Sequence, residues 1–237
     1  MNRLKTLLLL CFCLAFFLPT TWASEAPTVT VQGTSRMEIE PDQAFITLGV
    51  VSQAETAEAA RAQNAQNSTA VRDKIAALGI AAQQIHTSQF VIYPVYANEP
   101  DKSTKVAKII GYRVTNNITA QADDIASVGT IIDSALAAGA NQVTNVRFQK
   151  KNDNELKKAL LTEAVQNGLE KAQTIAAALN KKIKRVSSVT EQDLSFQQPD
   201  SPRLMLKAEL FSSNAATPIS PGTIIATGTV SLICELE

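Results

Sequence analysis

A strand–helix–strand pattern over residues 111–148 constrains the fold more than any other part of this 237-residue chain. Residues 112–119 form two alternating sets of side chains with a period of two, which is typical of a strand with one buried face. Asp123 or Asp124 is then a candidate N-cap for a helix whose aliphatic residues recur at helical spacing: Ile125, Val128, Ile132 and Leu136. Gly139 follows, where a left-handed C-cap favours glycine, and a second strand begins near Val143. The segment predicts a scaffold and contains no recognisable catalytic motif.

Similar periodicity predicts the remaining elements. Strands are expected near residues 29–33, 44–50, 85–96, 183–189 and 224–234, and further helices at 52–78 and 153–179. The Glu40-Pro41-Asp42 turn suggests that the first two strands form an antiparallel hairpin, while Pro94 either ends its strand or restricts it to a sheet edge. The resulting order, ββαββαβαββ, predicts an α+β fold in which three helices pack on mainly antiparallel sheets.

The two longer helices have faces that are unusually small or polar. The core-facing stripe of the 52–78 helix, whose cap is expected at Ser52, continues backwards through four small or polar residues: Ala57, Ala60, Asn64 and Asn67. This part is either a solvated start to the helix, which is favoured, or a contact surface between subunits. On the 153–179 helix the stripe includes Gly168, and glycine costs about 1 kcal/mol there relative to alanine. We therefore expect another backbone to approach Gly168 closely.

Residues 192–220 contain three prolines and several serines and have no sustained periodicity, which predicts a long loop. A loop of this length is either mobile or functional, and Arg203, Leu204 and Met205 are its candidate partner contacts. In the strand that follows, Cys234 alternates onto the same face as Leu232. This favours a small buried hydrophobic residue over a reactive thiol.

Residues 1–23 have the pattern of a cleaved signal peptide. Arg3 and Lys5 precede an apolar run at residues 7–18, and Thr21-Trp22-Ala23 has the small residues of a signal-peptidase site. An uncleaved anchor is the alternative, but about a dozen apolar residues are too few for a membrane span that needs roughly 20. The sequence therefore predicts export, with residues 24–237 as a soluble mature chain.

Removal of residues 1–23 leaves 20 basic and 22 acidic residues, because Arg3 and Lys5 are lost and no acidic residue is. A net charge of −2 offers no global electrostatic reason to bind nucleic acid. Cys234 becomes the only cysteine, so no intramolecular disulfide can form in an oxidising compartment.

The sequence offers few groups for catalysis. His86 is the only histidine, no Ser-His or Cys-His pair has a supporting spacing, and no glycine-rich nucleotide motif is present. We therefore expect no enzymatic activity, no metal and no cofactor; a hydrolase or redox site would need His86 or Cys234 in a cleft beside a carboxylate. The main alternative function is a monomeric module that binds a small ligand or peptide near Tyr93, Tyr96 and the 192–220 loop.

Several short motifs occur in a characteristic order. They are Gly33 with Pro41-Asp42 and Ala44, Gly111-Tyr112-Arg113-Val114-Thr115-Asn116, Asp133-Ser134-Ala135 with Gly139-Ala140-Asn141, Lys171-Ala172 with Ile175-Ala176, and Pro218-Ile219 with Pro221-Gly222. With the final strand, their order and spacing resemble the SIMPL-domain family, which includes bacterial periplasmic immunogenic proteins. The resemblance covers nearly the whole mature chain, from about residue 29 to residue 236. Asn180 stands where the family commonly has glycine, and asparagine also adopts the left-handed conformation.

The resemblance implies an exported, non-catalytic protein of the periplasm or outer envelope, with ring- or barrel-like oligomers among some relatives. It also implies an association with stress defence, oxidative stress in particular, and peripheral association with the outer membrane is a further expectation. We therefore expect a homo-oligomeric scaffold with no assigned ligand. Its subunit contacts are expected at strand edges and at the Ala57, Ala60, Asn64 and Asn67 face, and the 192–220 loop is expected to contact partners or line an opening.

Overall fold

The computed structural model describes residues 26–97, 107–197 and 217–237. The predicted signal peptide and the candidate loop contacts Arg203, Leu204 and Met205 lie outside the described residues. The elements follow the order ββαββαβαββ, with two antiparallel sheets and three helices, so the predicted α+β class and element order are confirmed.

The first layer is a four-stranded antiparallel sheet with two helices on one face. Its strands lie in the order β3 (Ile85–Tyr96), β4 (Ile109–Ala122), β2 (Gln43–Ala54) and β5 (Gln142–Gln149). Helices α2 (Ala57–Ala77) and α3 (Val128–Ala137) pack on it, and the short 3-10 helices η1 (Ala82–Gln84) and η2 (Ile125–Ser127) precede β3 and α3. The strand–helix–strand unit predicted at residues 111–148 is thus present as β4, α3 and β5.

The second layer is a three-stranded antiparallel sheet covered by one long helix. The strand order is β1 (Thr28–Ile39), β7 (Ile224–Leu236) and β6 (Ile183–Gln197). Helix α4 (Asn154–Ala178) packs mainly on β1 and β7 and barely reaches β6. The edge strand β6 is therefore left largely uncovered.

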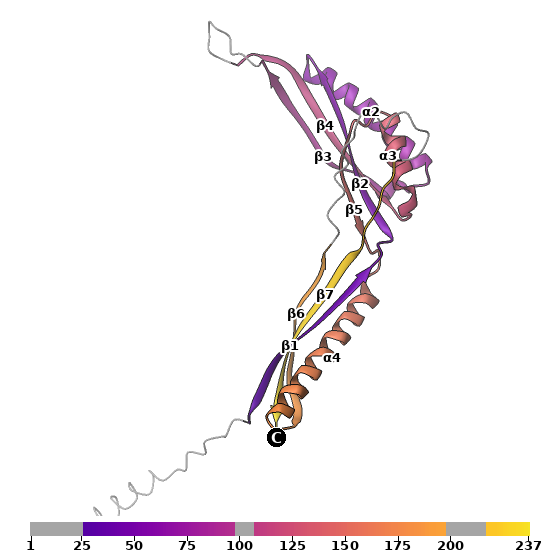
Figure 1. The fold of residues 1–237 in the computed structure, drawn as a ribbon. Coiled ribbons are helices and arrows are strands. Elements are labelled where there is room, and N and C mark those ends of the chain that lie inside the picture. Colours follow the sequence, from indigo (N-terminus) through magenta and orange to yellow (C-terminus); the bar gives the residue numbers. More distant parts are fainter. Residues whose placement is uncertain (1–25, 98–106, 198–216) are drawn as a thin grey trace, which may run out of the picture.

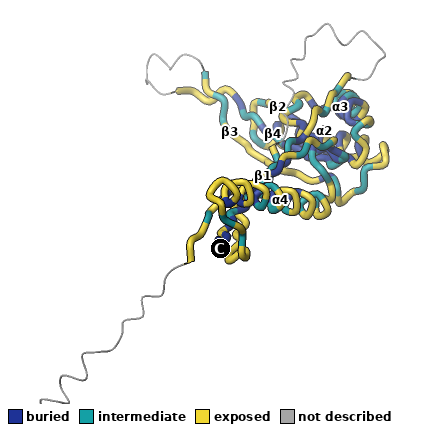
Figure 2. The backbone as a smooth tube through the Cα atoms, turned by 60° about the horizontal axis from the view of Figure 1, so that its bottom comes forward, coloured by how far each residue is buried: buried dark blue, intermediate teal, exposed yellow. Residues whose placement is uncertain are grey.

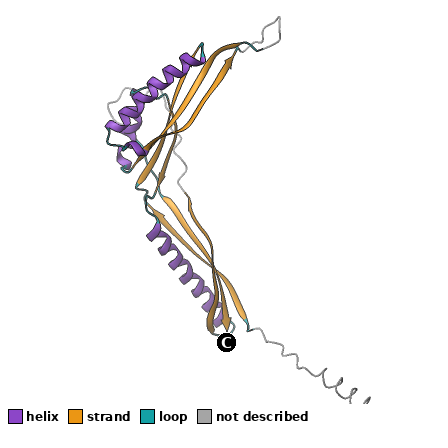
Figure 3. Cartoon of the chain, turned by 180° about the vertical axis from the view of Figure 1, so that it is seen from behind, coloured by secondary structure: helices purple, strands orange, loops and turns teal. Residues whose placement is uncertain are grey.

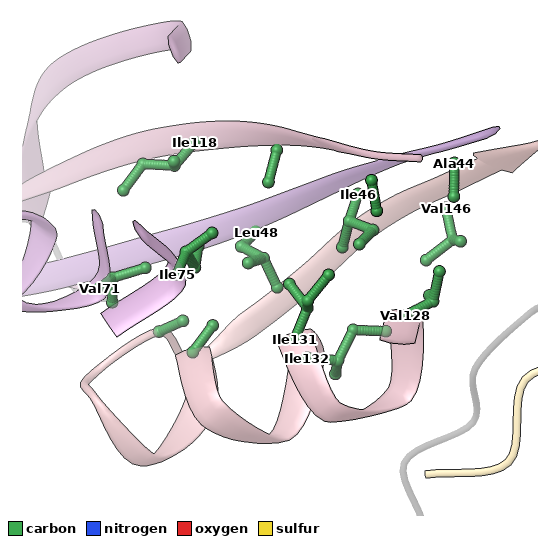
Figure 4. Packing of buried hydrophobic residues seen from close by; sticks show 14 of the residues in the cluster. Ala44, Ile46, Leu48, Val71, Ile75, Ile118, Val128, Ile131, Ile132 and Val146 are labelled. Atoms are coloured by element: carbon green, nitrogen blue, oxygen red, sulfur yellow. The ribbon is translucent and has the colours of Figure 1, made fainter. Parts of the chain in front are cut away.

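The two layers follow each other end to end, which makes the molecule long and bent (Figure 1). All three helices lie on the same side, along the outer side of the bend, as the view from behind also shows (Figure 3). Each layer has its own buried cluster of aliphatic side chains. The larger one, centred on Ile46, Leu48 and Ile131, lies between the four-stranded sheet and α2 and α3 (Figure 4). The smaller one, which includes Leu232 and Cys234, lies beneath α4.

The predicted hairpin of the first two strands is wrong. β1 pairs with β7 along its whole length, from Thr28 opposite Glu235 to Ile39 opposite Ile224, whereas β2 pairs with β4 and β5. The chain crosses from one sheet to the other at residues 40–42, where Asp42 accepts a hydrogen bond from the backbone N–H of Lys151 at 2.7 Å. The Pro41-Asp42 turn therefore joins two layers instead of two neighbouring strands.

Several element boundaries also differ from the prediction. Helix α2 begins at Ala57, capped by Thr56, whose hydroxyl accepts a hydrogen bond from the Ala59 N–H at 3.2 Å, while Ser52 belongs to β2. β1 continues past Gly33 to Ile39, and β6 extends to Gln197, so residues 192–197 of the predicted loop are in a strand.

The predicted close approach to Gly168 is confirmed. β1 crosses α4 at Gly33, where an added Cβ atom would lie only 1.9 Å from the carbonyl oxygen of Ala164 and 2.8 Å from the amide nitrogen of Gly168. The two glycines therefore let a strand backbone and a helix backbone touch. At the helix C-terminus Asn180 has a φ of 55°, the left-handed conformation expected of it.

The two layers are also linked at the start of the segment that leads into β7. The N–H and hydroxyl of Thr217 donate to the Asp133 carboxylate of α3, at 2.9 and 2.5 Å. Ile219 packs against the larger cluster before the chain enters β7. Among the described helices, none is long and apolar enough to cross a membrane.

Candidate functional site

An exposed apolar surface follows the edge strand β3. This strand pairs only with β4, and its residues beyond Ile85 are largely exposed (Figure 2). Phe90 is 51% exposed, although it points to the same side as the buried Val114, because α2 packs mainly on β4 and β2 and barely contacts β3. Ile92 lies directly opposite Val114 and is also exposed. Since Pro94 was expected either to end its strand or to place it at an edge, the edge position is confirmed.

The same surface continues onto the beginning of β4. Tyr96 pairs with Ile109 and is 49% exposed, and the neighbouring Ile110 is 54% exposed. We call the exposed apolar residues of this strand pair the β3 edge: Phe90, Val91, Ile92, Tyr93, Tyr96, Ile109 and Ile110. Apolar side chains on both faces of one edge strand are unusual for a surface that faces only water.

A second exposed edge lies on the three-stranded sheet. Val186 and Val189 of β6 pair with the buried Cys234 and Leu232, so they point to the side of the sheet that α4 covers. Because α4 barely reaches β6, Val189 is nevertheless 52% exposed. We call these two valines and the strand that holds them the β6 edge.

Two of the four predicted subunit contacts, Ala60 and Asn64, lie in the interior of one chain. Both residues are 0% exposed within one chain, because this face of α2 lies against β2 and β4. The Asn64 side-chain amide donates to the carbonyl of Val50 at 2.7 Å, and its oxygen accepts a hydrogen bond from Ser68 at 3.3 Å. A buried amide with these partners belongs to the interior of the subunit.

The other two residues of that face are partly buried. Ala57 lies at the start of α2. A Cβ atom added at Gly139 would lie 3.4 Å from the Cβ atom of Asn67, so Asn67 contacts the end of α3 in the same chain. The favoured expectation of a solvated helix start is wrong, since the sheet covers Ala60 and Asn64.

The two residues considered for chemistry lie in different layers. His86 is an exposed residue of β3, opposite Thr119, whereas Cys234 is buried on β7, where burial raises the pKa of its thiol. The prediction that Cys234 is a buried hydrophobic residue is confirmed. Within the described ranges, no three His, Cys, Asp or Glu side chains gather closely enough to hold a metal ion.

Tyr93 and Tyr96, proposed as ligand contacts in the alternative function, are both exposed on β3. The guanidinium of Arg113 lies 5.9 Å from the centre of the Tyr93 ring. A cavity of about 300 Å³ lies between α2 and the start of β3, and Arg72, Asp73 and Ile85 are among its lining residues. The lining does not include either tyrosine.

Charged groups gather where the chain crosses between the layers. The ammonium of Lys150 lies 2.7 Å from the carboxylate of Asp42, and that of Lys151 lies 2.6 Å from the carboxylate of Asp123. The hydrogen bonds from Lys151 and from the Gln43 amide lower the pKa of Asp123 to about 2. The pKa of Asp42 is lowered by Lys150 and by the Lys151 N–H.

Sequence reasoning named strand edges in general but missed the residues that form them. The run Phe90-Val91-Ile92-Tyr93 could have identified the β3 edge, because it places apolar side chains on both faces of the strand. Pro94, which follows the run, is compatible with an edge position of this strand. A central strand covered on both faces has such a run, and an edge strand facing water does not.

The fold and these surfaces define an α+β protein with two helix-backed antiparallel sheets, in which two of the four described edge strands, β3 and β6, expose large apolar side chains. A family model described as "SIMPL: Protein of unknown function (DUF541)" matches residues 29–233. The chain therefore belongs to the SIMPL family, as its motifs indicated.

Curated relatives cover most of the chain. The "26 kDa periplasmic immunogenic protein" of Brucella melitensis is 28% identical over 205 residues, which are 86% of this chain and 80% of the relative. The "Uncharacterized protein YggE" of Escherichia coli is 23% identical over 213 residues, which are 90% of this chain and 85% of the relative. The YggE protein of Edwardsiella ictaluri is also 23% identical, over 81% of this chain and 79% of its own length.

Proposed function

We propose that this SIMPL-family protein is an exported, non-catalytic scaffold of the bacterial periplasm that assembles with copies of itself and supports envelope integrity and tolerance of oxidative stress. The name of the Brucella relative, a periplasmic immunogenic protein, supports the location. The resemblance to the family supports the link to stress defence. The observation that carries the assembly is the β3 edge.

An edge strand presents unpaired N–H and C=O groups that can pair with another chain. Proteins commonly protect such edges with lysine, other charged side chains or bulges. The pairing of β3 with β4 shifts register near both ends of the strand, between Thr87 and Gln89 and between Val95 and Tyr96. Between these shifts β3 contains no Lys, Arg, Asp or Glu, and it exposes aromatic and aliphatic side chains on both faces. Burial of the β3 edge against a second copy would remove this apolar surface from water, at about 25 cal/mol per Å².

The second contact of each copy is the β6 edge. A copy that uses one edge only can form a dimer, whereas two different edges allow every copy to contact two neighbours. We assign the pairing to β3 of one copy and β6 of the next, because both strands expose apolar side chains on the helix side of their sheets. Unlike β3, the β6 strand also carries charged residues, namely Lys184, Arg185, Glu191 and Asp193. Such head-to-tail contacts close into a ring when the rotation between copies permits it.

The cellular role is tested in a strain that lacks the gene. Complementation with the natural protein is expected to restore survival in peroxide and resistance of the envelope to detergent. A Phe90→Lys/Val189→Lys variant, which places a charge on each edge, is expected to restore neither, while circular dichroism shows that it is folded. The control is Leu78→Lys, since Leu78 is an exposed apolar residue at the end of α2 and on neither edge. Full rescue by the two-edge variant would contradict the proposal.

A further inference from the structure

The four-stranded sheet has a second face, which none of the described helices covers (Figures 1 and 3). It consists of the residues that alternate with the buried ones, and we call it the open face. Its central members on β2 and β4 are Phe45, Thr47, Gly49, Val51, Gln53, Arg113, Thr115, Asn117, Thr119 and Gln121. His86, Gln89 and Tyr93 of β3 and Gln142 and Arg147 of β5 extend it to both sides.

The open face is free of carboxylates. None of the strands β2, β3, β4 and β5 contains Asp or Glu, whereas all three strands of the other sheet do. The ionisable bases of these four strands, Arg113, Arg147 and His86, all belong to the open face. Asp123, which follows β4, is paired with Lys151 at 2.6 Å. The face therefore complements an anionic ligand, although the mature chain as a whole is slightly acidic.

Both guanidinium groups are held in place by neighbours on the same face. Arg113 lies over the Tyr93 ring and donates to the Gln53 side-chain oxygen at 3.0 Å. Arg147 lies over Phe45, 5.1 Å from the centre of the ring. A guanidinium that is already oriented loses less conformational entropy when it binds, and its planar fork suits the two oxygens of a carboxylate.

Hydroxyl and amide side chains fill the space between the two arginines. The hydroxyls of Thr47 and Thr119 are 3.1 Å apart, Thr119 donates to Ser88 at 3.1 Å, and the Asn117 amide donates to Gln89 at 2.8 Å. Uncharged donors and acceptors in such a row match the hydroxyl groups of a sugar chain.

One acceptor in this row has no donor among the described residues. Asn117 is only 8% exposed, and its Oδ1 atom accepts no hydrogen bond there. It lies beside Gly49, where an added Cβ would be 3.2 Å from Oδ1 and 3.0 Å from the Cβ of the exposed Gln142, so the Gln142 side chain covers this position. An unsatisfied buried acceptor is costly, so a ligand hydroxyl that displaces Gln142 and donates to Asn117 is favoured.

We infer that the open face binds an extended acidic polysaccharide. Arg113 pairs with Gln53 of β2, and Arg147 pairs with Phe45 of the same strand. At about 3.3 Å per residue along β2, the two arginines are therefore about 26 Å apart along the sheet. A nucleic acid strand of that length carries about eight phosphates at about 3.4 Å each and offers few hydroxyl groups to the uncharged side chains between the two arginines. An acidic sugar chain presents carboxylates together with many hydroxyls, which can pair with that row of hydroxyl and amide groups. This inference goes beyond the scaffold function and does not depend on it.

The test is a titration of the purified protein with a fluorescent oligogalacturonate, with a malto-oligosaccharide of equal length as the neutral probe. Oligogalacturonate is expected to bind at least tenfold more tightly than the neutral probe. The Arg113→Gln/Arg147→Gln variant is expected to lose at least tenfold in affinity. The control, Arg61→Gln/Arg72→Gln, makes the same charge change on exposed residues of α2, on the opposite side of the sheet, and is expected to bind as the natural protein does.

The inference would be overturned by no binding of oligogalacturonate, by undiminished binding by the Arg113/Arg147 variant, or by an equal loss in the α2 control. Tighter binding of an oligothymidylate than of oligogalacturonate would show that the ligand class is wrong. A change in molar mass of the Arg113/Arg147 variant would make the open face a subunit contact and would also overturn it. Assembly that persists in the edge variants, with sugar binding unchanged, would contradict the scaffold proposal and leave this inference standing.

Discussion

At the scale of single residues, Gly33 and Gly168 determine how closely β1 can lie on α4. A methyl group at position 33 would meet the Ala164 carbonyl oxygen at 1.9 Å, so the strand and the helix would have to separate. At position 168 it would meet the flexible end of Leu232 at 2.4 Å, and alanine also favours the helix by about 1 kcal/mol. The backbone contact is therefore the harder one to relieve.

We predict that Gly33→Ala lowers the free energy of unfolding by about 3 kcal/mol and that Gly168→Ala lowers it by about 1 kcal/mol or less. Overpacking against a backbone carbonyl cannot be relieved by a side-chain rotation, which is the reason for the difference. Urea unfolding of the three proteins measures both values. Equal losses for the two variants would show that the crossing is looser than the structure indicates.

The carboxylate of Asp123 makes the stability of the fold depend on pH. Its pKa is lowered from 3.8 to about 2, mainly by the hydrogen bond from Lys151. A lowered carboxyl pKa adds stability that is fully present above pH 3.8 and is lost as the pH falls toward 2. We predict that the Asp123 carboxyl resonance titrates near pH 2 in the natural protein and moves toward 3.8 in Lys151→Gln. Lys157→Gln, which removes a surface pair with Asp153, is the control and should leave the titration unchanged.

At the scale of elements, the sequence predicted best what is local. The β4–α3–β5 unit was predictable because its caps, its apolar stripe and Gly139 are close together in the chain. The pairing of β1 with β7 was not, because it joins opposite ends of the chain and the alternation in β1 suits a hairpin equally well. The α2 face could not be assigned either, since an asparagine such as Asn64 looks the same in sequence whether it meets water, a partner or the Val50 carbonyl.

The two exposed edges allow a prediction about elements. Ile92→Lys blocks the β3 edge and Val189→Lys blocks the β6 edge, so each variant alone is expected to be a monomer if β3 pairs with β6 of the next copy. A mixture of the two still contains one intact edge of each kind. We therefore predict that mixing gives a heterodimer and nothing larger, measured by native mass spectrometry. Homodimers of the Val189→Lys variant alone would show instead that β3 pairs with β3.

At the scale of the whole molecule, the two layers have separate apolar clusters and are joined by short crossings. All three tyrosines, Tyr93, Tyr96 and Tyr112, are on β3 and β4, and Cys234 lies in the other layer. In a protein made of residues 24–237, which lacks Cys11, Cys13 and Trp22, tyrosine fluorescence and thiol labelling therefore report on different layers.

We predict that Ile75→Ala, which empties space in the larger cluster, destabilises the tyrosine-containing layer by about 3 kcal/mol. The urea midpoint for Cys234 labelling is expected to shift much less, because Cys234 packs in the other cluster. Equal shifts of both midpoints would show that the two layers unfold as one cooperative unit.

The central claim, assembly through exposed strand edges, is tested most directly by the molar mass of the mature protein, measured by light scattering after gel filtration over a range of concentrations. The account predicts a discrete multiple of the subunit mass, reduced to the subunit mass in the Phe90→Lys/Val189→Lys variant and unchanged in Leu78→Lys. A natural protein that is a monomer at every concentration would contradict it.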